Sequence, residues 1–268
     1  MKVIPKSAPS SQLLVLITGM SQAGSTLCFN IVRALMSYSG AKILIPDPPH
    51  TYLLRRADTA SPLEGAHLPG APEAVLIGKQ HDLPPTSPRH INNAPYTPDP
   101  DDPPVKIIRV RRDVRDAVAS RFRKEEVYNR DRDILKEYFD LNILWHESWA
   151  HAQDYDWAYE DYKEDPLAVT RELQGVLGLS HSDGVIAQVV HESENLKNFY
   201  DDKKECPGTL DGLKHMVPQD FENVTKMKEE QVTNNGVIGS YKDFFSEEEI
   251  VFINTTYGDW LKEHGYIK

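Results

Sequence analysis

Cysteine is scarce in this chain, and its scarcity excludes two kinds of organisation. The 268 residues contain two cysteines, Cys28 and Cys206, which lie far apart and lack metal-ligand spacing. The sequence therefore predicts neither a disulfide framework nor a cysteine zinc site. Basic residues are also in the minority: the chain has 30 lysines and arginines and 41 acidic residues, which gives a formal net charge of −11. Because such a surface repels phosphate backbones, we expect no nucleic-acid partner.

Long apolar runs are absent as well. The first run, residues 13–17, is too short to span a membrane and suits a buried strand. Residues 1–12 lack the apolar centre of a signal peptide and are expected to form a flexible N-terminus. We therefore expect a cytoplasmic protein with no membrane partner. No repeat or change of composition divides the chain, so we expect a single domain over residues 1–268.

Apolar runs alternate with segments of helical periodicity. Short apolar runs predict buried strands at 13–18, 74–78 and 105–110, and a short strand with its exit turn at 157–161. Helical spacing follows the first run and recurs at 113–124, within 133–153 and at 165–173. This alternation predicts an α/β fold, a parallel sheet flanked by helices with the ligand at the carboxyl ends of the strands. The proline-rich stretch 84–104 excludes a helix and indicates a surface loop or lid.

A glycine loop, residues 19–26, follows the first predicted strand and reads Gly-Met-Ser-Gln-Ala-Gly-Ser-Thr. Its glycine spacing is that of a Walker A loop, which aims backbone N–H groups and a helix N-terminus at phosphate oxygens. Ser25 stands where a Walker A loop needs lysine, which weakens an ATPase or kinase interpretation. Two interpretations stay open: a loop that binds an anionic phosphosulfate, and a tight strand-to-helix turn with no ligand.

Residues 21–27, Ser-Gln-Ala-Gly-Ser-Thr-Leu, resemble the 5′-phosphosulfate loop of sulfotransferases that use 3′-phosphoadenosine 5′-phosphosulfate (PAPS). Segments 76–84, 112–120 and 159–166 resemble further motifs of that family in the same order, and 234–242 is a looser match. The chain is thus similar to cytosolic-type, small-molecule sulfotransferases over residues 13 to about 245. The resemblance implies their P-loop-like nucleotide-binding fold.

The resemblance also implies roles for individual residues. His81 takes the place of the catalytic base, and Lys79 that of the cation that contacts the sulfuryl group. The implied cofactor-binding residues are Gln22, Ala23, Gly24, Ser25, Thr26, Leu27, Arg112, Ser120, Tyr159, Asn234, Asn235 and Gly236. No metal ligand is implied.

The chain departs from the family pattern at several of these positions. Gln22 stands where the family has lysine or arginine, and Asn234 and Asn235 stand where it has Arg-Lys. Leu27 replaces a tryptophan that stacks on adenine in many members. Cationic contacts to the cofactor that relatives make are therefore absent at these positions.

The proposed catalytic pair also follows from strand geometry and acid–base chemistry. Residues two apart share a strand face, so Lys79 and His81 can point at one reacting centre. Histidine has an unperturbed pKa near 6.5, which suits a base at neutral pH. The helical context of His146, His151 and His191 indicates structural roles instead.

The proposed 3′-phosphate site has a competing interpretation. A predicted strand ends near Arg112 and a helix follows, which brings an arginine fork and the Ser120 hydroxyl to one phosphate. Alternatively, the arginines form an ordinary solvated basic cluster, and Tyr159 is a core aromatic. The four arginines concerned are Arg109, Arg111, Arg112 and Arg115.

The predicted function is transfer of a sulfuryl group from PAPS to a hydroxyl or amine of a small molecule, which leaves 3′-phosphoadenosine 5′-phosphate (PAP). The acidic surface favours a polar or cationic natural product of secondary metabolism as acceptor. The alternatives are a P-loop-type small-molecule kinase and a catalytically dead nucleotide-binding relative. No dimerisation motif is present, so no oligomeric state is predicted.

Overall fold

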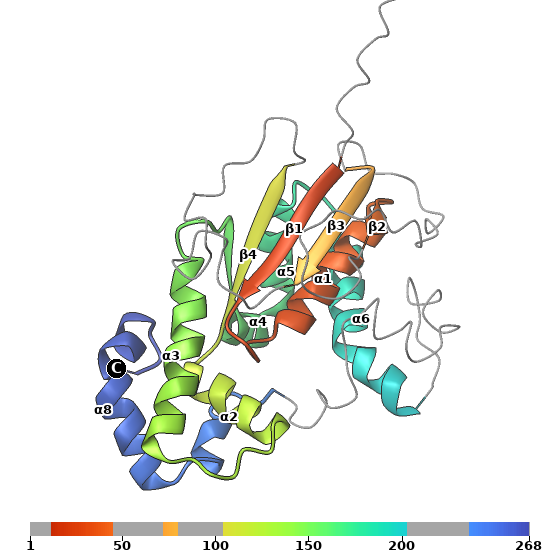
Figure 1. The fold of residues 1–268 in the computed structure, drawn as a ribbon. Helices are drawn as coiled ribbons and strands as arrows, with labels where there is room; N and C mark the ends of the chain where they lie inside the picture. The colour runs from red at the N-terminus through yellow and green to blue at the C-terminus, as the bar shows by residue number, and fades with distance from the viewer. Residues whose placement is uncertain (1–11, 45–71, 80–103, 203–235, 268) are drawn as a thin grey trace, which may run out of the picture.

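The computed structural model describes residues 12–44, 72–79, 104–202 and 236–267 (Figure 1). Their strands form one parallel five-stranded sheet in the order β2-β3-β1-β4-β5. The strands are β1 (Gln12–Gly19), β2 (Lys42–Leu44), β3 (Ala74–Lys79), β4 (Val105–Arg111) and β5 (Tyr155–Ala158). The predicted parallel α/β fold is confirmed. The proline-rich stretch 84–104 lies outside the described residues except for Pro104.

Helices follow most strands, as the sequence predicted. They are α1 (Ser25–Tyr38), α2 (Val114–Lys124), α3 (Arg132–Ser148), α4 (Tyr159–Glu164), α5 (Pro166–Val176), α6 (Asp183–Asp202) and α8 (Glu247–Glu263), with a short 3₁₀ helix η3 (Ser240–Asp243). Two details differ from the prediction. Strand β5 begins and ends earlier than 157–161, and β2 was not predicted.

The core lies on both sides of the central strand β1. Leu13, Val15 and Ile17 on one face of β1 are buried, whereas Leu14 and Leu16 on the other face are half-buried. Helices α1, α5 and α6 pack together behind the sheet in Figure 1, while α3 contacts β1 and β4. In the described ranges, no helix has the combination of length and apolar character that crossing a bilayer requires.

Strand direction decides where the predicted site residues can meet. In the register of the sheet, Ile17 pairs with Lys79, Gly19 with Val110, and Arg111 with Ala158. Because all strands are parallel, their carboxyl ends lie at the same edge of the sheet. The glycine loop after β1, Lys79 at the end of β3, the turn after β4 and the start of α4 after β5 therefore lie at this edge.

Candidate functional site

The glycine loop connects β1 to α1 and has a positive φ at three residues, Gly19 (φ 107°), Gln22 (φ 61°) and Gly24 (φ 89°). A Cβ atom at Gly24 would lie 2.7 Å from Cδ2 of Tyr159 and 3.0 Å from the ring of Trp157. Glycine therefore lets the corner between β5 and α4 pack directly on the loop. Gly24 is the N-cap of α1 and supplies no side-chain cap, and the first turn has no acidic residue. This helix N-terminus is electrostatically suited to an anion.

Lys79 lies beside the glycine loop. It is the last residue of β3, and its Nζ donates a hydrogen bond to Oγ1 of Thr26 at 2.7 Å. Thr26 is the second residue of α1, so the ammonium group lies at the helix N-terminus. The structure thus brings the predicted sulfuryl-contacting cation and the predicted phosphosulfate loop together.

The arginines of β4 and the following turn are not a solvated cluster, so that interpretation is wrong. Arg109, Arg112 and Arg115 are buried, and Arg111 is half-buried. Nε of Arg109 donates to the Asp156 carboxylate at 3.0 Å, and Nε of Arg111 donates to it at 2.8 Å. These two side chains therefore brace β4 against β5.

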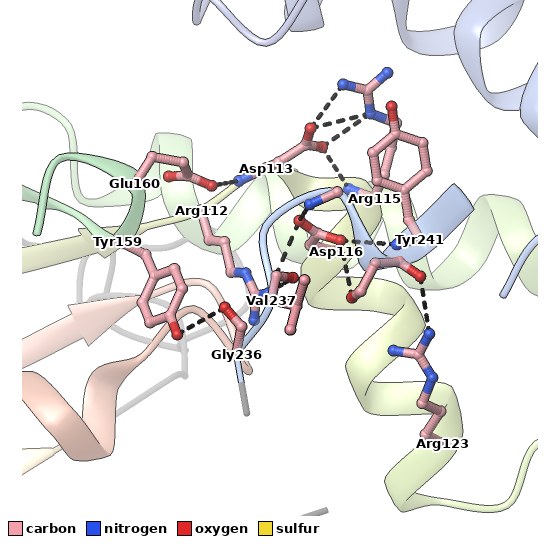
Figure 2. Close-up of polar contacts among 12 residues, drawn as sticks. Arg112, Asp113, Arg115, Asp116, Arg123, Tyr159, Glu160, Gly236, Val237 and Tyr241 are labelled. Atoms are coloured by element: carbon pink, nitrogen blue, oxygen red, sulfur yellow. Dashed lines mark hydrogen bonds and ion pairs between the residues drawn. The ribbon is translucent and has the colours of Figure 1, made fainter. Parts of the chain in front are cut away.

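Arg115 also has a structural partner. The Asp113 carboxylate caps the N-terminus of α2 and accepts from Nη2 of Arg115 at 2.6 Å (Figure 2). Burial alone would lower the pKa of Arg115, but the hydrogen bond and the charge of Asp113 raise it. Arg115 further donates to the Tyr266 carbonyl at 3.0 Å, which fixes the end of the described chain.

Arg112 has the weakest carboxylate partner of these four arginines. Its Nη2 donates to the Val237 carbonyl at 3.0 Å, while the nearest carboxylate oxygen, on Asp116, is 3.8 Å away. Its guanidinium carbon lies 4.6 Å from the centre of the Tyr159 ring. Its Nε is buried and has no hydrogen-bond partner among the described residues. A buried guanidinium with an unsatisfied donor is suited to an anionic ligand.

Tyr159 joins the glycine loop to the C-terminal turn, residues 236–241. Its hydroxyl donates to the Gly236 carbonyl at 2.9 Å, and a Cβ atom at Gly236 would collide with that hydroxyl at 1.7 Å. Burial raises the pKa of Tyr159 although the charge of Arg112 opposes the shift, so the phenol stays neutral. Tyr159 is also part of the hydrophobic core. Its interpretation as a core aromatic is therefore correct, and it contacts the predicted site as well.

Asp116 holds the C-terminal turn, and sequence reasoning missed it. Its fully buried carboxylate accepts from the Gly239 amide at 2.7 Å, the Tyr241 amide at 2.9 Å and the Ser240 hydroxyl at 3.2 Å (Figure 2). Arg123, about two helical turns after Asp116 on α2, donates to the Ser240 carbonyl at 2.9 Å. The turn is thus fixed against α2 and beside Arg112.

Glu160 was also missed. One oxygen of its carboxylate accepts from the Asp113 amide at 2.8 Å, and the other is buried with no partner among the described residues. Burial raises the pKa of Glu160, against the effect of that hydrogen bond. The only sequence signal for Glu160 was its place directly after Tyr159.

The structure describes most of the predicted site residues and brings them to one edge of the sheet. Ala23 and Ser25 are buried in the glycine loop, and Leu27 is half-buried in the first turn of α1. Ser120 is half-buried on α2, one turn after Asp116. His81, Asn234 and Asn235 lie outside the described residues.

Known proteins similar to this chain point to one family. A family model described as a sulfotransferase domain matches residues 15–265. Among curated proteins, no sequence matches the chain significantly.

Solved structures match at low sequence identity. Mouse sulfotransferase SULT7A1 complexed with PAP is 13% identical, with a TM-score of 0.55 over 95% of this chain and 86% of that one. Retinol dehydratase in a complex with retinol and PAP is 18% identical, with a TM-score of 0.50 over 96% and 82%. A complex of retinol dehydratase with androsterone and the inactive cofactor PAP is 15% identical, with a TM-score of 0.51 over the same shares. At these identities, the likeness establishes the fold.

Proposed function

This chain belongs to the sulfotransferase family, and on that premise we propose that it transfers a sulfuryl group from PAPS to a hydroxyl or amine of a small molecule. One observation carries the proposal above the others. Arg112 is buried beside Tyr159, its Nε has no hydrogen-bond partner among the described residues, and the Asp116 carboxylate is 3.8 Å from its Nη2. Arg109 and Arg115, the other buried arginines of β4 and the following turn, form close ion pairs with carboxylates. Arg112 is therefore the guanidinium suited to a phosphate.

The glycine loop and Lys79 would hold the 5′-phosphosulfate. Backbone N–H groups at the start of α1 and the hydroxyls of Ser25 and Thr26 supply donors, and Lys79 supplies positive charge. Gln22 adds a neutral donor where relatives place a cation. Lys79 therefore provides most of the cationic stabilisation on this side of the site.

Arg112 and Ser120 would hold the 3′-phosphate. The C-terminal turn lies against Arg112, and Asp116 fixes that turn through three hydrogen bonds. Gly236 and the neighbouring Asn234 and Asn235 would contact the same phosphate through neutral donors. Tyr159 lies against Gly24 and Arg112 and would pack near the adenine.

The chemistry is an in-line displacement at sulfur. The acceptor oxygen or nitrogen forms a bond to sulfur while the bond from sulfur to the 5′-phosphate oxygen breaks, and PAP departs. His81 takes the acceptor proton, and Lys79 neutralises the charge that develops on the oxygens of the transferred group. Lys79 and His81 are two positions apart in the sequence, with Gln80 between them.

We further propose a cytoplasmic enzyme with a polar or cationic acceptor and no nucleic-acid partner. The cytosolic-type motifs support the location. The net charge of −11 supports the acceptor class, because a negative surface attracts cations and repels polyanions.

A transfer assay tests the proposal. PAPS labelled with ³⁵S is incubated with panels of hydroxyl and amine acceptors, and labelled product and PAP are quantified. We expect product with at least one polar or cationic acceptor, and His81→Ala should lower kcat at least about 10²-fold. His151→Ala, a change at an exposed histidine, is the matched control and should keep wild-type turnover. Transfer of phosphate from ATP in place of sulfate would contradict the proposal, as would PAP binding without turnover of any acceptor.

A further inference from the structure

Helices α3 and α8 lie side by side and are joined by polar and aromatic contacts (Figure 1). The rings of Phe139 and Tyr257 stack with centroids 5.0 Å apart, and the Tyr257 hydroxyl donates to Asp140 at 2.9 Å. Further along both helices, Nε1 of Trp260 donates to Oε1 of Glu147 at 2.8 Å. These contacts hold the last turns of the two helices in a common register.

Three potential metal ligands meet at those last turns. One ligand atom from each of His146, Glu147 and His264 lies within 4.8 Å of the other two. Nε2 of His264 is 3.5 Å from Oε1 of Glu147, and Nε2 of His146 is 4.0 Å from the same oxygen.

His146 supplies a second, independent indication of a ligand. Its side chain is completely buried, and both ring nitrogens lack a hydrogen-bond partner among the described residues. Leaving a buried polar group unsatisfied is costly, so such groups almost always have a partner. A metal ion would satisfy one of these nitrogens.

We propose that His146, Glu147 and His264 bind a divalent transition-metal ion of the zinc class, which joins α8 to α3. Two imidazoles and a carboxylate are a donor set that zinc accepts, with water as a fourth ligand. Zinc–ligand bonds of about 2.0–2.2 Å place tetrahedral ligand atoms about 3.3–3.6 Å apart. The observed separations need only small side-chain movements to reach that range.

The surroundings of His264 match those of a metal-binding histidine. Its Nδ1 lies 2.9 Å from the Trp260 carbonyl, which can only accept a hydrogen bond, so Nε2 is the nitrogen that faces Glu147 and is left for a metal ion. The Trp260 indole stacks on the His264 ring at 4.0 Å and donates to the Glu147 carboxylate. Both ligands are therefore held in place by one neighbouring side chain.

The charges around the cluster permit a cation. Glu147 contributes a negative charge to the cluster, and the charge of Asp156 also acts on His146. Arg109 and Arg111 are the nearby cations that act on His146. Both are paired with Asp156, which offsets their repulsion of a metal ion.

The proposed metal site is separate from the sulfotransferase site. None of the residues assigned to PAPS lies on α3 or α8. The consequence is structural, because α8 leads to Tyr266, whose carbonyl and hydroxyl accept from Arg115 and Arg111. A bound ion would stabilise the attachment of this C-terminal segment to the sheet.

Metal binding by the full, untagged chain tests the inference. The protein is stripped with a chelator, and Zn²⁺ or Co²⁺ is added while calorimetry measures affinity and stoichiometry and a melting curve measures Tm. We expect binding of one equivalent, a rise in Tm, and Co²⁺ absorption bands of a low-coordinate nitrogen and oxygen site.

Variants on half-buried or exposed ligands separate the site from a folding defect. His264→Gln and Glu147→Gln should each weaken Zn²⁺ binding at least tenfold while the metal-free Tm stays near that of the wild type. His191→Gln, a change at an exposed histidine of α6, should leave the affinity unchanged. No stoichiometric binding by the wild type would overturn the proposal, and so would wild-type affinity in His264→Gln.

Discussion

Arg112 and Arg115 are buried guanidiniums three residues apart, and they have different kinds of partner. Arg115 is paired with Asp113 at 2.6 Å, whereas Arg112 contacts a carbonyl oxygen and an aromatic ring. Removing one member of a buried ion pair leaves the other charge uncompensated, while removing a ligand-binding group mainly affects the ligand. The two residues should therefore respond differently to the same substitution.

The Arg112→Ala variant should bind PAP about 10- to 150-fold more weakly, which corresponds to the loss of a charge-assisted contact of about 1.5–3 kcal/mol. Arg115→Ala should instead lower the free energy of unfolding by about 3 kcal/mol, because Asp113 loses its partner. Calorimetry with PAP and denaturant titration of both variants measure the two effects. Equal PAP affinity in Arg112→Ala and the wild type would show that Arg112 does not hold the phosphate.

Lys79 and Gln22 should contribute unequally to turnover. Neutral hydrogen bonds are about half as strong as charge-assisted ones, so Lys79→Ala should lower kcat/KM several-fold more than Gln22→Ala. Gln22→Lys should partly rescue Lys79→Ala, since it restores a cation at the position where relatives carry one. Alanine or lysine at position 22 keeps the left-handed strain that glutamine already has there.

A double-mutant cycle on kcat/KM measures this coupling. Lys106→Ala is the matched control, because Lys106 is a surface lysine paired with Asp154 and should be nearly neutral. If Gln22→Ala proves the more damaging single change, the amide of Gln22 has the larger role and the proposed division is wrong.

At the scale of elements, the packing of the β5–α4 corner on the glycine loop depends on Gly24. Gly24→Ala adds both left-handed strain and a Cβ atom 2.7 Å from Tyr159. Gly178 has a similar φ of 71°, and a Cβ atom there would meet nothing within 4 Å. Gly178→Ala therefore measures the cost of the left-handed backbone alone, which is about 1–2 kcal/mol of folding free energy.

We expect Gly24→Ala to cost about 1–3 kcal/mol more than Gly178→Ala, in the range of overpacking, and to abolish detectable PAP binding. Gly178→Ala should bind PAP normally. Denaturant unfolding and calorimetry check both statements. Equal destabilisation by the two substitutions would mean that the corner does not need to approach the loop closely.

The strands that position the site could be predicted because their buried residues form continuous apolar runs. The positions of Lys79 and Arg112 near strand ends could be predicted in the same way, while their roles came from the resemblance to sulfotransferases. Strand β5 was placed too late because Asp156 falls within it, and an acidic residue is typical of a strand only where arginines of the neighbouring strand pair with it. The three residues of β2 form a strand by pairing with β3, which no local pattern reveals.

The contacts between distant segments could not be predicted. Asp116 and the C-terminal turn are more than 120 residues apart, and nothing in either segment indicates the other. The burial of the arginines was missed for the same reason. An arginine-rich segment is typical of a solvated face, and its carboxylate partners become visible only when the sheet is assembled.

For the whole molecule, the net charge of −11 opposes the binding of an anionic ligand. A polyanionic nucleotide is repelled by the general field, so its binding depends on a few local groups at the edge of the sheet. Lys79 contacts the start of α1 beside the glycine loop, and Arg112 contacts the C-terminal turn. We therefore expect the 5′-phosphosulfate and the 3′-phosphate to be bound by different residues.

Ligand-dependent stability of the full chain tests this central claim most directly. Melting curves and calorimetry compare PAP with adenosine 5′-monophosphate, which lacks the 3′-phosphate, and with ATP and magnesium. PAP at about 100 times its Kd should add about 2.7 kcal/mol of stability, and the monophosphate should bind at least about tenfold more weakly. Equal affinity for PAP and the monophosphate, or stabilisation by ATP with magnesium alone, would contradict the assignment of this edge of the sheet to PAPS.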